Sequence, residues 1–203
     1  LDHTLLHACE APAGSEAVPP AGVHPLRLHS PKGTMRYWVR LREGLHAFLR
    51  EASQFATLHV FTMAARTYTL HILNAIDPEC ALVTGRIFCR EDGQEETFDK
   101  SLAHVRKPRG EALGDDECGG EGDAWPGCDE YIVLDDRLEV WDRRSQPAVL
   151  RVTPFRAFTS MGEVIPPPPA ADVALHDSLA VLRRVACALE RGEQPSAAAA
   201  PAA

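Results

Sequence analysis

Tyr131-Ile132-Val133-Leu134-Asp135-Asp136-Arg137 decides the fold of this chain, because four large apolar residues run directly into two carboxylates. An apolar run without polar alternation is typical of a parallel strand that is buried on both faces. In open α/β sheets, ligands bind in the crevice at the carboxyl ends of such strands. We therefore expect Asp135 and Asp136 to line a crevice, where a cation such as Mg²⁺ would offset their mutual repulsion. A plain turn after the strand would account for the pair equally well.

Composition narrows the class of function. The 203 residues suit one domain with a sizeable core, and the formal net charge of −8 gives no basic footprint for nucleic acid. We expect a protein or small-molecule partner and no direct nucleic-acid contact. The six cysteines contain no C-x-x-C pair, which argues against a zinc ribbon and favours a reducing compartment. No apolar run approaches the roughly 18 to 20 residues that span a bilayer, so no membrane partner is expected.

The rest of the chain alternates between strand and helix patterns. Strand-like apolar runs occur at residues 37–41, 58–61, 86–89 and 149–152. Helical periodicity occurs at 45–52, 64–76 and 175–189, and a short helix or turn begins at Lys100. This alternation predicts a doubly wound, Rossmann-like α/β fold with a mostly parallel sheet.

Three segments do not fit the alternation. Residues 8–34 contain five prolines and predict a loop. Residues 108–128 are acidic and rich in glycine, and we expect a mobile surface loop there. Residues 191–203 are rich in alanine and proline and predict a disordered tail. The predicted organisation is one domain over residues 1–190, with two loops, and a tail.

Polar side chains follow the strand patterns in a distinctive order. Asp2 and Thr4 flank a turn near the start, Thr62 follows the strand pattern at 58–61, and Lys100 precedes the carboxylate pair. The first motif alone would be plain turn chemistry more often than a site. The whole set has the order of the four motifs of the haloacid dehalogenase superfamily of phosphotransferases, D-x-D-x-T, Ser/Thr, Lys and D-D.

The amino-acid sequence around each of these motifs resembles one family more closely. Matching stretches are Leu1-Asp2-His3-Thr4-Leu5-Leu6, Val39-Arg40-Leu41-Arg42-Glu43-Gly44-Leu45, His59-Val60-Phe61-Thr62-Met63, Ile76-Asp77-Pro78, Gly85-Arg86-Ile87-Phe88, Lys100-Ser101-Leu102 and Leu134-Asp135-Asp136-Arg137. From Leu1 to about Phe158 the chain resembles the TFIIF-associating phosphatases that act on the C-terminal domain of RNA polymerase II. The resemblance implies a fold of the haloacid dehalogenase type and an aspartyl-phosphate mechanism.

The resemblance also implies roles for single residues. The nucleophilic Asp would stand immediately before Leu1, so residues 1–203 by themselves are expected to be inactive. Asp2 would bind Mg²⁺ through its carbonyl and act as general acid and base. Thr62 and Lys100 would bind the phosphate oxygens. The remaining candidates are the metal-binding pair Asp135 and Asp136, and the substrate-binding residues Thr4, Arg42 and Tyr68. Glu43 replaces the proline that the family has beside Arg42, which puts the pose of Arg42 in doubt.

The implied substrate is the phosphorylated C-terminal domain of RNA polymerase II in the nucleus, with TFIIF as a further possible partner. Thr4 and Thr62 are 58 positions apart, and Thr62 and Lys100 are 38 apart. Predicted strands and helices of the core occupy most of both intervals. We therefore expect no cap domain, that is, no inserted domain that covers the site. An uncapped site favours a phosphopeptide over a metabolite.

Two other functions remain open from the sequence. One is a non-catalytic interaction module with the same fold, like the relatives in the mitochondrial inner-membrane translocase. The other is a small-molecule phosphatase of the same superfamily. The identity of the residue that precedes Leu1 distinguishes the interaction module from an enzyme, since an enzyme requires Asp there. Comparing the hydrolysis of phosphopeptides and of sugar phosphates distinguishes a small-molecule phosphatase from a protein phosphatase.

Overall fold

A computed structural model describes residues 1–11, 18–30, 33–93, 100–106, 131–167 and 171–192. The predicted acidic loop at 108–128 lies outside the described residues. The predicted tail does too, apart from residues 191 and 192. None of the described helices is both long and apolar enough to cross a membrane.

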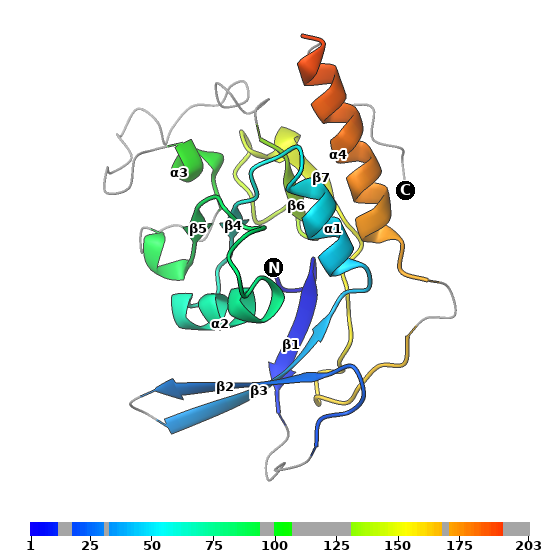
Figure 1. The fold of residues 1–203 in the computed structure, drawn as a ribbon. Coiled ribbons are helices and arrows are strands. Elements are labelled where there is room, and N and C mark those ends of the chain that lie inside the picture. Colours follow the sequence, from blue (N-terminus) through cyan, green and yellow to red (C-terminus); the bar gives the residue numbers. More distant parts are fainter. Residues whose placement is uncertain (12–17, 31–32, 94–99, 107–130, 168–170, 193–203) are drawn as a thin grey trace.

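The first part of the chain forms a three-stranded antiparallel sheet. Its strands are β1 (Leu6–Glu10), β2 (His24–Ser30) and β3 (Gly33–Leu41), in the order β1-β3-β2. The β2-β3 hairpin projects from the body of the molecule (Figure 1). The prediction of a loop over residues 8–34 is therefore wrong for the stretches that form strands. Proline misled it, since Pro25 lies on the edge strand β2, where a missing N–H is tolerated.

The rest of the described chain alternates helices with short parallel strands. In order, these are α1 (Leu45–Ala52), β4 (Val60–Phe61), α2 (Arg66–Ile76), β5 (Ile87–Phe88), η1 (Arg90–Asp92), α3 (Leu102–Arg106), β6 (Val133–Asp135), η4 (Gln146–Ala148), β7 (Val149–Arg151) and α4 (Ala174–Glu190). β4 pairs with β5 and β6 pairs with β7, both in parallel. The predicted alternation and the parallel pairing are confirmed, but β6 is not buried on both faces, because Val133 and Leu134 are only half-buried.

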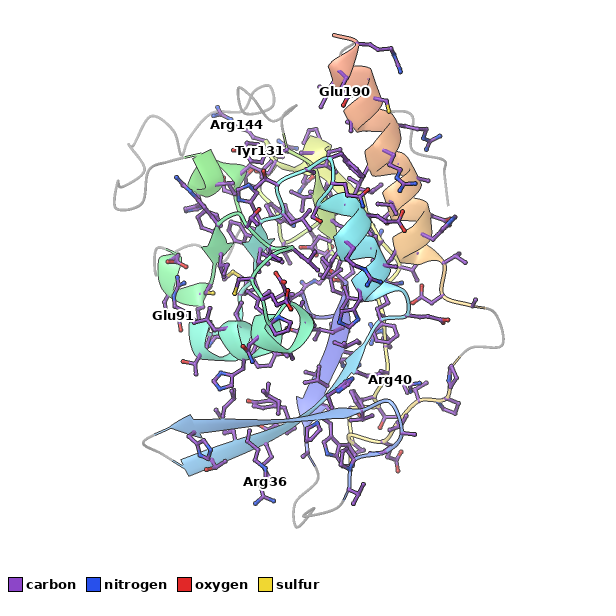
Figure 2. All side chains as sticks on the ribbon, in the orientation of Figure 1. Arg36, Arg40, Glu91, Tyr131, Arg144 and Glu190 are labelled. Atoms are coloured by element: carbon purple, nitrogen blue, oxygen red, sulfur yellow. The ribbon has the colours of Figure 1, made fainter. Side chains whose placement is uncertain are left out.

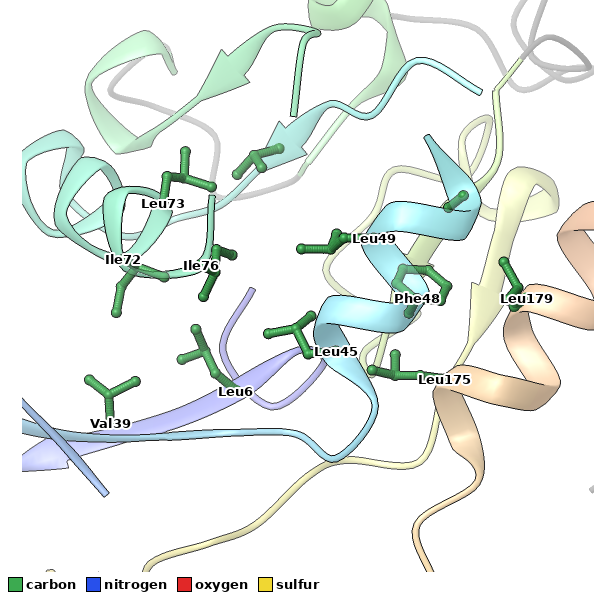
Figure 3. Packing of buried hydrophobic residues seen from close by; sticks show 12 residues of the cluster. Leu6, Val39, Leu45, Phe48, Leu49, Ile72, Leu73, Ile76, Leu175 and Leu179 are labelled. Carbon is green, nitrogen blue, oxygen red and sulfur yellow. The ribbon is translucent and has the colours of Figure 1, made fainter. Parts of the chain in front are cut away.

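The main core lies where α1, α2 and α4 meet β1 and β3. Leu6 is fully buried, and Leu45 and Ile72 are almost so (Figure 3). α1 buries the stripe that the sequence predicts, at Leu45, Phe48, Leu49 and Ala52, and it packs beside α4. Gly44 begins this helix with φ of 75°, a left-handed conformation that glycine adopts without strain.

A second, smaller cluster supports the segment that carries Lys100. Its buried members are Leu102, Val105 and Trp141, and Phe61 and Phe88 pack against it. The Phe61 ring lies 5.2 Å from that of Trp141. The ends of β4 and β5 are thereby tied to the loop that follows β6.

Candidate active site

The turn at residues 1–6 positions Asp2 and Thr4. The Leu1 carbonyl accepts a hydrogen bond from the Leu5 N–H at 2.9 Å, and His3 takes a left-handed conformation with φ of 61°. Few residues other than glycine adopt this conformation, and it often marks a functional turn. Leu6, at the start of β1, anchors the turn in the core.

Thr4 joins this turn to the carboxylates at the end of β6. Its side chain is buried, and its hydroxyl donates a hydrogen bond of 3.0 Å to Oδ1 of Asp136. These two residues are 132 positions apart in the sequence. The first and last sequence motifs therefore meet, as the doubly wound fold predicts.

Arg42 holds the turn from the other side. Its guanidinium donates to the Thr4 carbonyl at 2.9 Å and forms a two-point ion pair with Asp172 at 2.7 and 3.0 Å. Arg42 was predicted to bind substrate, but in this arrangement its buried side chain points to the segment before α4. Sequence reasoning missed Asp172. The one local signal was its place two residues before α4, where it also accepts a bond from the Ala174 N–H.

Tyr68, on α2, holds Asp2. Its hydroxyl donates a hydrogen bond of 2.8 Å to Oδ1 of Asp2. Burial, together with the negative charge of Asp2, raises the pKa of Tyr68 far above its ordinary value. Tyr68 therefore stays protonated and acts as a donor that fixes the orientation of the Asp2 carboxyl.

Lys100 pairs with Asp135 in a buried arrangement. The Lys100 ammonium lies 2.7 Å from Oδ2 of Asp135, and the Trp141 indole N–H donates to the same oxygen at 2.9 Å. The other oxygen accepts a bond of 3.0 Å from the Arg137 N–H. Burial alone would raise the pKa of Asp135, but the charge of Lys100 and these hydrogen bonds outweigh it and hold the pKa below its usual value. The sequence gives no local signal for this bond between Trp141 and Asp135.

The charges of Asp2, Lys100, Asp135 and Asp136 all act on the amino group of Leu1. This amino group is buried, and its pKa is lowered by burial and by the positive charge of Lys100. Asp2, Asp135 and Asp136 act on it in the opposite direction. All four ionisable side chains therefore lie within electrostatic reach of one atom.

Thr62 is connected to this group less directly. It is buried at the carboxyl end of β4, where its N–H donates to the Phe88 carbonyl at 2.9 Å. Its hydroxyl accepts a bond of 3.2 Å from the Ala64 N–H. The structure thus places Thr62 by its own backbone contacts, at the same end of the parallel strands as Asp135.

The donor set suits a small, hard cation. Within the described residues, Oδ2 of Asp136 accepts no hydrogen bond, whereas both oxygens of Asp135 are engaged. Mg²⁺ is usually bound by one or two carboxylates, with water and phosphate completing its octahedral shell. No group of three or more His, Cys, Asp and Glu in the described part of the chain could hold a metal ion alone. The residues therefore fit a magnesium ion that is shared with a phosphate, and Asp136 is the better placed ligand.

Comparisons with known proteins agree with this geometry. The family model for "NLI interacting factor-like phosphatase" matches residues 1–163. An RNA polymerase II C-terminal domain phosphatase of Schizosaccharomyces pombe is 28% identical over 177 residues, which are 81% of this chain and 21% of the relative. The RNA polymerase II C-terminal domain phosphatase-like 1 of Arabidopsis thaliana is 32% identical over 160 residues, or 76% of this chain and 13% of the relative. The chain thus spans about a fifth or less of these relatives.

A solved structure matches nearly the whole chain. The structure described as "Fcp1, an essential RNA polymerase II CTD phosphatase" superposes with a TM-score of 0.60 and 25% sequence identity. The match covers 98% of this chain and 50% of that one. The fold is therefore the haloacid dehalogenase type of α/β fold that the sequence predicted. With the family model matching 163 of the 203 residues, the chain belongs to the NLI interacting factor-like phosphatase family.

Proposed function

We propose that this chain carries the catalytic domain of a protein serine phosphatase that acts on the C-terminal domain of RNA polymerase II. The family and the names of the similar proteins support the activity and the substrate class. The observation that carries the proposal is that the first, third and fourth motifs meet: the Thr4 hydroxyl donates to Asp136, and Lys100 pairs with the adjacent Asp135. A phosphate monoester resists attack because its oxygens are negative, and this site supplies both cationic charge and a proton donor.

The reaction takes place in two steps. In the first, a carboxylate on the residue before Leu1 attacks the phosphorus, and the bond to the serine oxygen breaks. Asp2 gives its proton to that oxygen. In the second, Asp2 takes a proton from water, the water oxygen attacks the phosphorus, and the acyl phosphate bond breaks to release inorganic phosphate. Tyr68 keeps the Asp2 carboxyl in place through both steps.

The phosphate oxygens are bound by groups that the fold fixes in advance. Lys100 is the cation for the transferred phosphoryl group, and its pairing with Asp135 prevents it from swinging away. Thr62 supplies a hydroxyl from the end of β4. Asp136 and the Asp2 carbonyl would hold Mg²⁺, with Asp135 alongside, and the ion would neutralise negative charge on the phosphate. Thr4 orients Asp136, and Arg42 fixes Thr4.

The substrate class follows from the chemistry of the site and from the relatives. We propose a phosphoserine in an extended peptide, as in the heptad repeats of the polymerase tail, reached through an uncapped opening. A nuclear location and an encounter with TFIIF would follow from this substrate.

The test uses a chain in which Leu-Val-Leu-Val-Asp precedes Leu1. We expect it to release phosphate from a phosphoserine heptad peptide and to work poorly on sugar phosphates. EDTA should abolish the activity, and so should Asn in place of the added Asp. Equal and measurable rates for the Asp and Asn versions would contradict the mechanism, and no activity in the Asp version would favour a non-catalytic module. Faster hydrolysis of sugar phosphates would favour a metabolite phosphatase.

A further inference from the structure

The β2-β3 hairpin concentrates positive charge in an otherwise acidic chain. Residues 24–41, which hold both strands and the turn between them, contain three arginines, one lysine and no Asp or Glu. The chain as a whole has a formal net charge of −8. Because the hairpin projects from the body of the molecule (Figure 1), this positive charge is presented on an arm and not spread over the surface.

Two of the arginines face each other across the hairpin. Arg27 is the register partner of Arg36 in the antiparallel ladder, so both side chains leave the sheet on the same face, and both are exposed. Like charges directly opposite each other on neighbouring strands destabilise a sheet. Within the described residues, Arg27 has no ion-pair partner that would offset the repulsion. An anion bound between the two guanidinium groups would replace repulsion by attraction to both.

Further polar and cationic groups share this face of the sheet. Next to the arginine pair, the exposed side chains of His29 and Thr34 form a hydrogen bond of 2.9 Å across the two strands. In the other direction along β3, the half-buried Arg40 lies opposite His7 of β1, and the charge of Arg156 acts on that histidine. Among the described strand residues on this face there is no Asp or Glu. Positive charge therefore extends along much of the face.

This cationic face, formed by Arg27, Arg36 and Arg40, looks away from the proposed active site. Side chains alternate along β3, and its opposite face carries Tyr37, whose ring lies 5.8 Å from that of Tyr68 on α2. Tyr68 in turn borders the proposed active site. Figure 2 shows Arg36 on the side of the hairpin that is turned away from α2. An anion held by the arginine pair is therefore a different group from the phosphate that is hydrolysed.

We propose that the cationic face is a docking surface for further phosphoserines of the same substrate chain. The inference rests on the proposed function, which supplies a tail of repeats with several phosphates. A phosphoserine carries a charge of about −1.5 to −2 and three acceptor oxygens, which arginine binds with paired, charge-assisted hydrogen bonds. β3 has nine residues and is about 30 Å long, whereas two extended heptads span about 46 Å. Two repeats are thus long enough to pass around the hairpin.

A phosphopeptide suits this face better than a nucleic acid does. All 29 acidic residues of the chain lie outside residues 24–41. A long polyanion would be repelled wherever it extended beyond the hairpin, because exposed charges act over roughly 8–10 Å at moderate salt. A peptide with separate phosphates places its negative charge only where the arginines lie.

The experiment measures the affinity of residues 1–203 for two labelled three-heptad peptides, which carry one or three phosphoserines, by fluorescence anisotropy. Magnesium is present, and salt is kept at about 50 mM, where exposed charges are weakly screened. We expect the triply phosphorylated peptide to bind about 30-fold more tightly, of which about threefold reflects the number of phosphates and about tenfold the added contacts. Arg27→Gln with Arg36→Gln should reduce the ratio to about threefold. The melting temperature should not fall, since a like-charge pair is removed.

The matched control is Arg50→Gln with Arg184→Gln, which removes the same charge from exposed positions on α1 and α4 and should keep the ratio near its original value. A ratio of about threefold in the unchanged chain, or equal ratios in the two double variants, would overturn the proposal. So would tighter binding of a single-stranded RNA of equal charge than of the triply phosphorylated peptide. Hydrolysis of the singly phosphorylated peptide by the Asp-extended chain tests the proposed function separately, because that substrate has no second phosphate for the cationic face.

Discussion

At the residue scale, the proposed mechanism depends most on the ion pair between Lys100 and Asp135. Replacing Lys100 by Ala removes the cation that we propose binds the phosphate, and it leaves Asp135 buried without its main partner. In the chain extended with Leu-Val-Leu-Val-Asp we expect kcat to fall by about 10²–10³-fold, the usual loss for one charge-stabilising donor. The measurement is phosphate release from a phosphoserine peptide. Arg50→Ala, an exposed change on α1, is the control and should be neutral. A normal rate for Lys100→Ala would refute this role.

Arg42 and Asp172 form the second decisive pair at this scale. The Arg42 side chain is 2% exposed and that of Asp172 is 20% exposed. Asp172→Ala leaves a buried guanidinium without its carboxylate, so we expect the free energy of unfolding to fall by about 2–4 kcal/mol. Urea denaturation measures this change. Asp177→Ala, at a side chain of α4 that is 69% exposed, should change stability by less than about 0.5 kcal/mol. Similar losses in the free energy of unfolding for both variants would contradict a specific stabilising role of the ion pair between Arg42 and Asp172.

Some contacts between single residues could not be predicted from the sequence. Arg42 was singled out, but its partner Asp172 is 130 positions away and no local pattern reveals that pairing. The same holds for the bond from Trp141 to Asp135, because nothing in the sequence around Trp141 indicates where its indole N–H points. The structure brings Asp2, Thr4, Lys100, Asp135 and Asp136 together, and their catalytic roles remain predictions.

At the scale of elements, the close approach of Gly85, just before β5, to residues 58 and 59, just before β4, gives a sharp test. A Cβ on Gly85 would lie 2.7 Å from the His59 ring and 2.7 Å from the Leu58 carbonyl. Gly85→Ala should therefore destabilise the fold by about 1–3 kcal/mol, as overpacking usually does. Gly93→Ala is a matched control, since the nearest atom, the Arg90 carbonyl oxygen, would be at an ordinary 3.4 Å. Thermal unfolding measures both, and equal stability of the two variants would show that the region accommodates the methyl group.

The segment at 155–158 is held on β1 by a neutral histidine. Nδ1 of His7 accepts bonds from the N–H groups of Ala157 and Phe158 at 3.0 and 3.2 Å. Burial, and then the neighbouring His3, lower the pKa of His7. An unfolded histidine titrates near about 6.5. The stability that His7 contributes is therefore present above that pH and is lost as pH falls toward the lower folded pKa.

We accordingly expect the free energy of unfolding to fall between pH 7 and pH 5, as urea titrations at each pH would measure. Burial also lowers the pKa of His59, which adds to the trend. His7→Asn should flatten the pH dependence, since no proton is then taken up at this position on unfolding. A slope unchanged by His7→Asn would show that other groups cause it.

Helices and strands differ in how accurately their bounds could be predicted from the sequence. The predicted helix at 45–52 matches α1, because its apolar spacing is regular and Gly44 marks its start. Strand lengths were overestimated, since the strand predicted over residues 58–61 is only the two-residue β4 in the structure. The error at residues 8–34 came from weighing prolines above the alternation in β2, where Leu26 and Leu28 face inward.

For the whole molecule, the order of motifs along the chain was the most informative signal. A doubly wound fold brings the ends of its parallel strands to one edge. Together with the resemblance in motif order, this allowed Asp2, Lys100 and Asp135 to be expected near one another before their contacts were known. The separation of the parallel strands into two pairs, β4 with β5 and β6 with β7, could not be foreseen, because no local pattern encodes it.

The central claim is that these separate segments form one site that grips a phosphoryl group. The most direct measurement is the steady-state rate of phosphate release from a phosphoserine heptad peptide, for the Asp-extended chain and its Asp136→Asn variant. Because Asp136 is the best placed magnesium ligand, the account predicts a loss of about 10³-fold or more at an unchanged melting temperature. A rate within about twofold of the parent, at saturating peptide and magnesium, would contradict it.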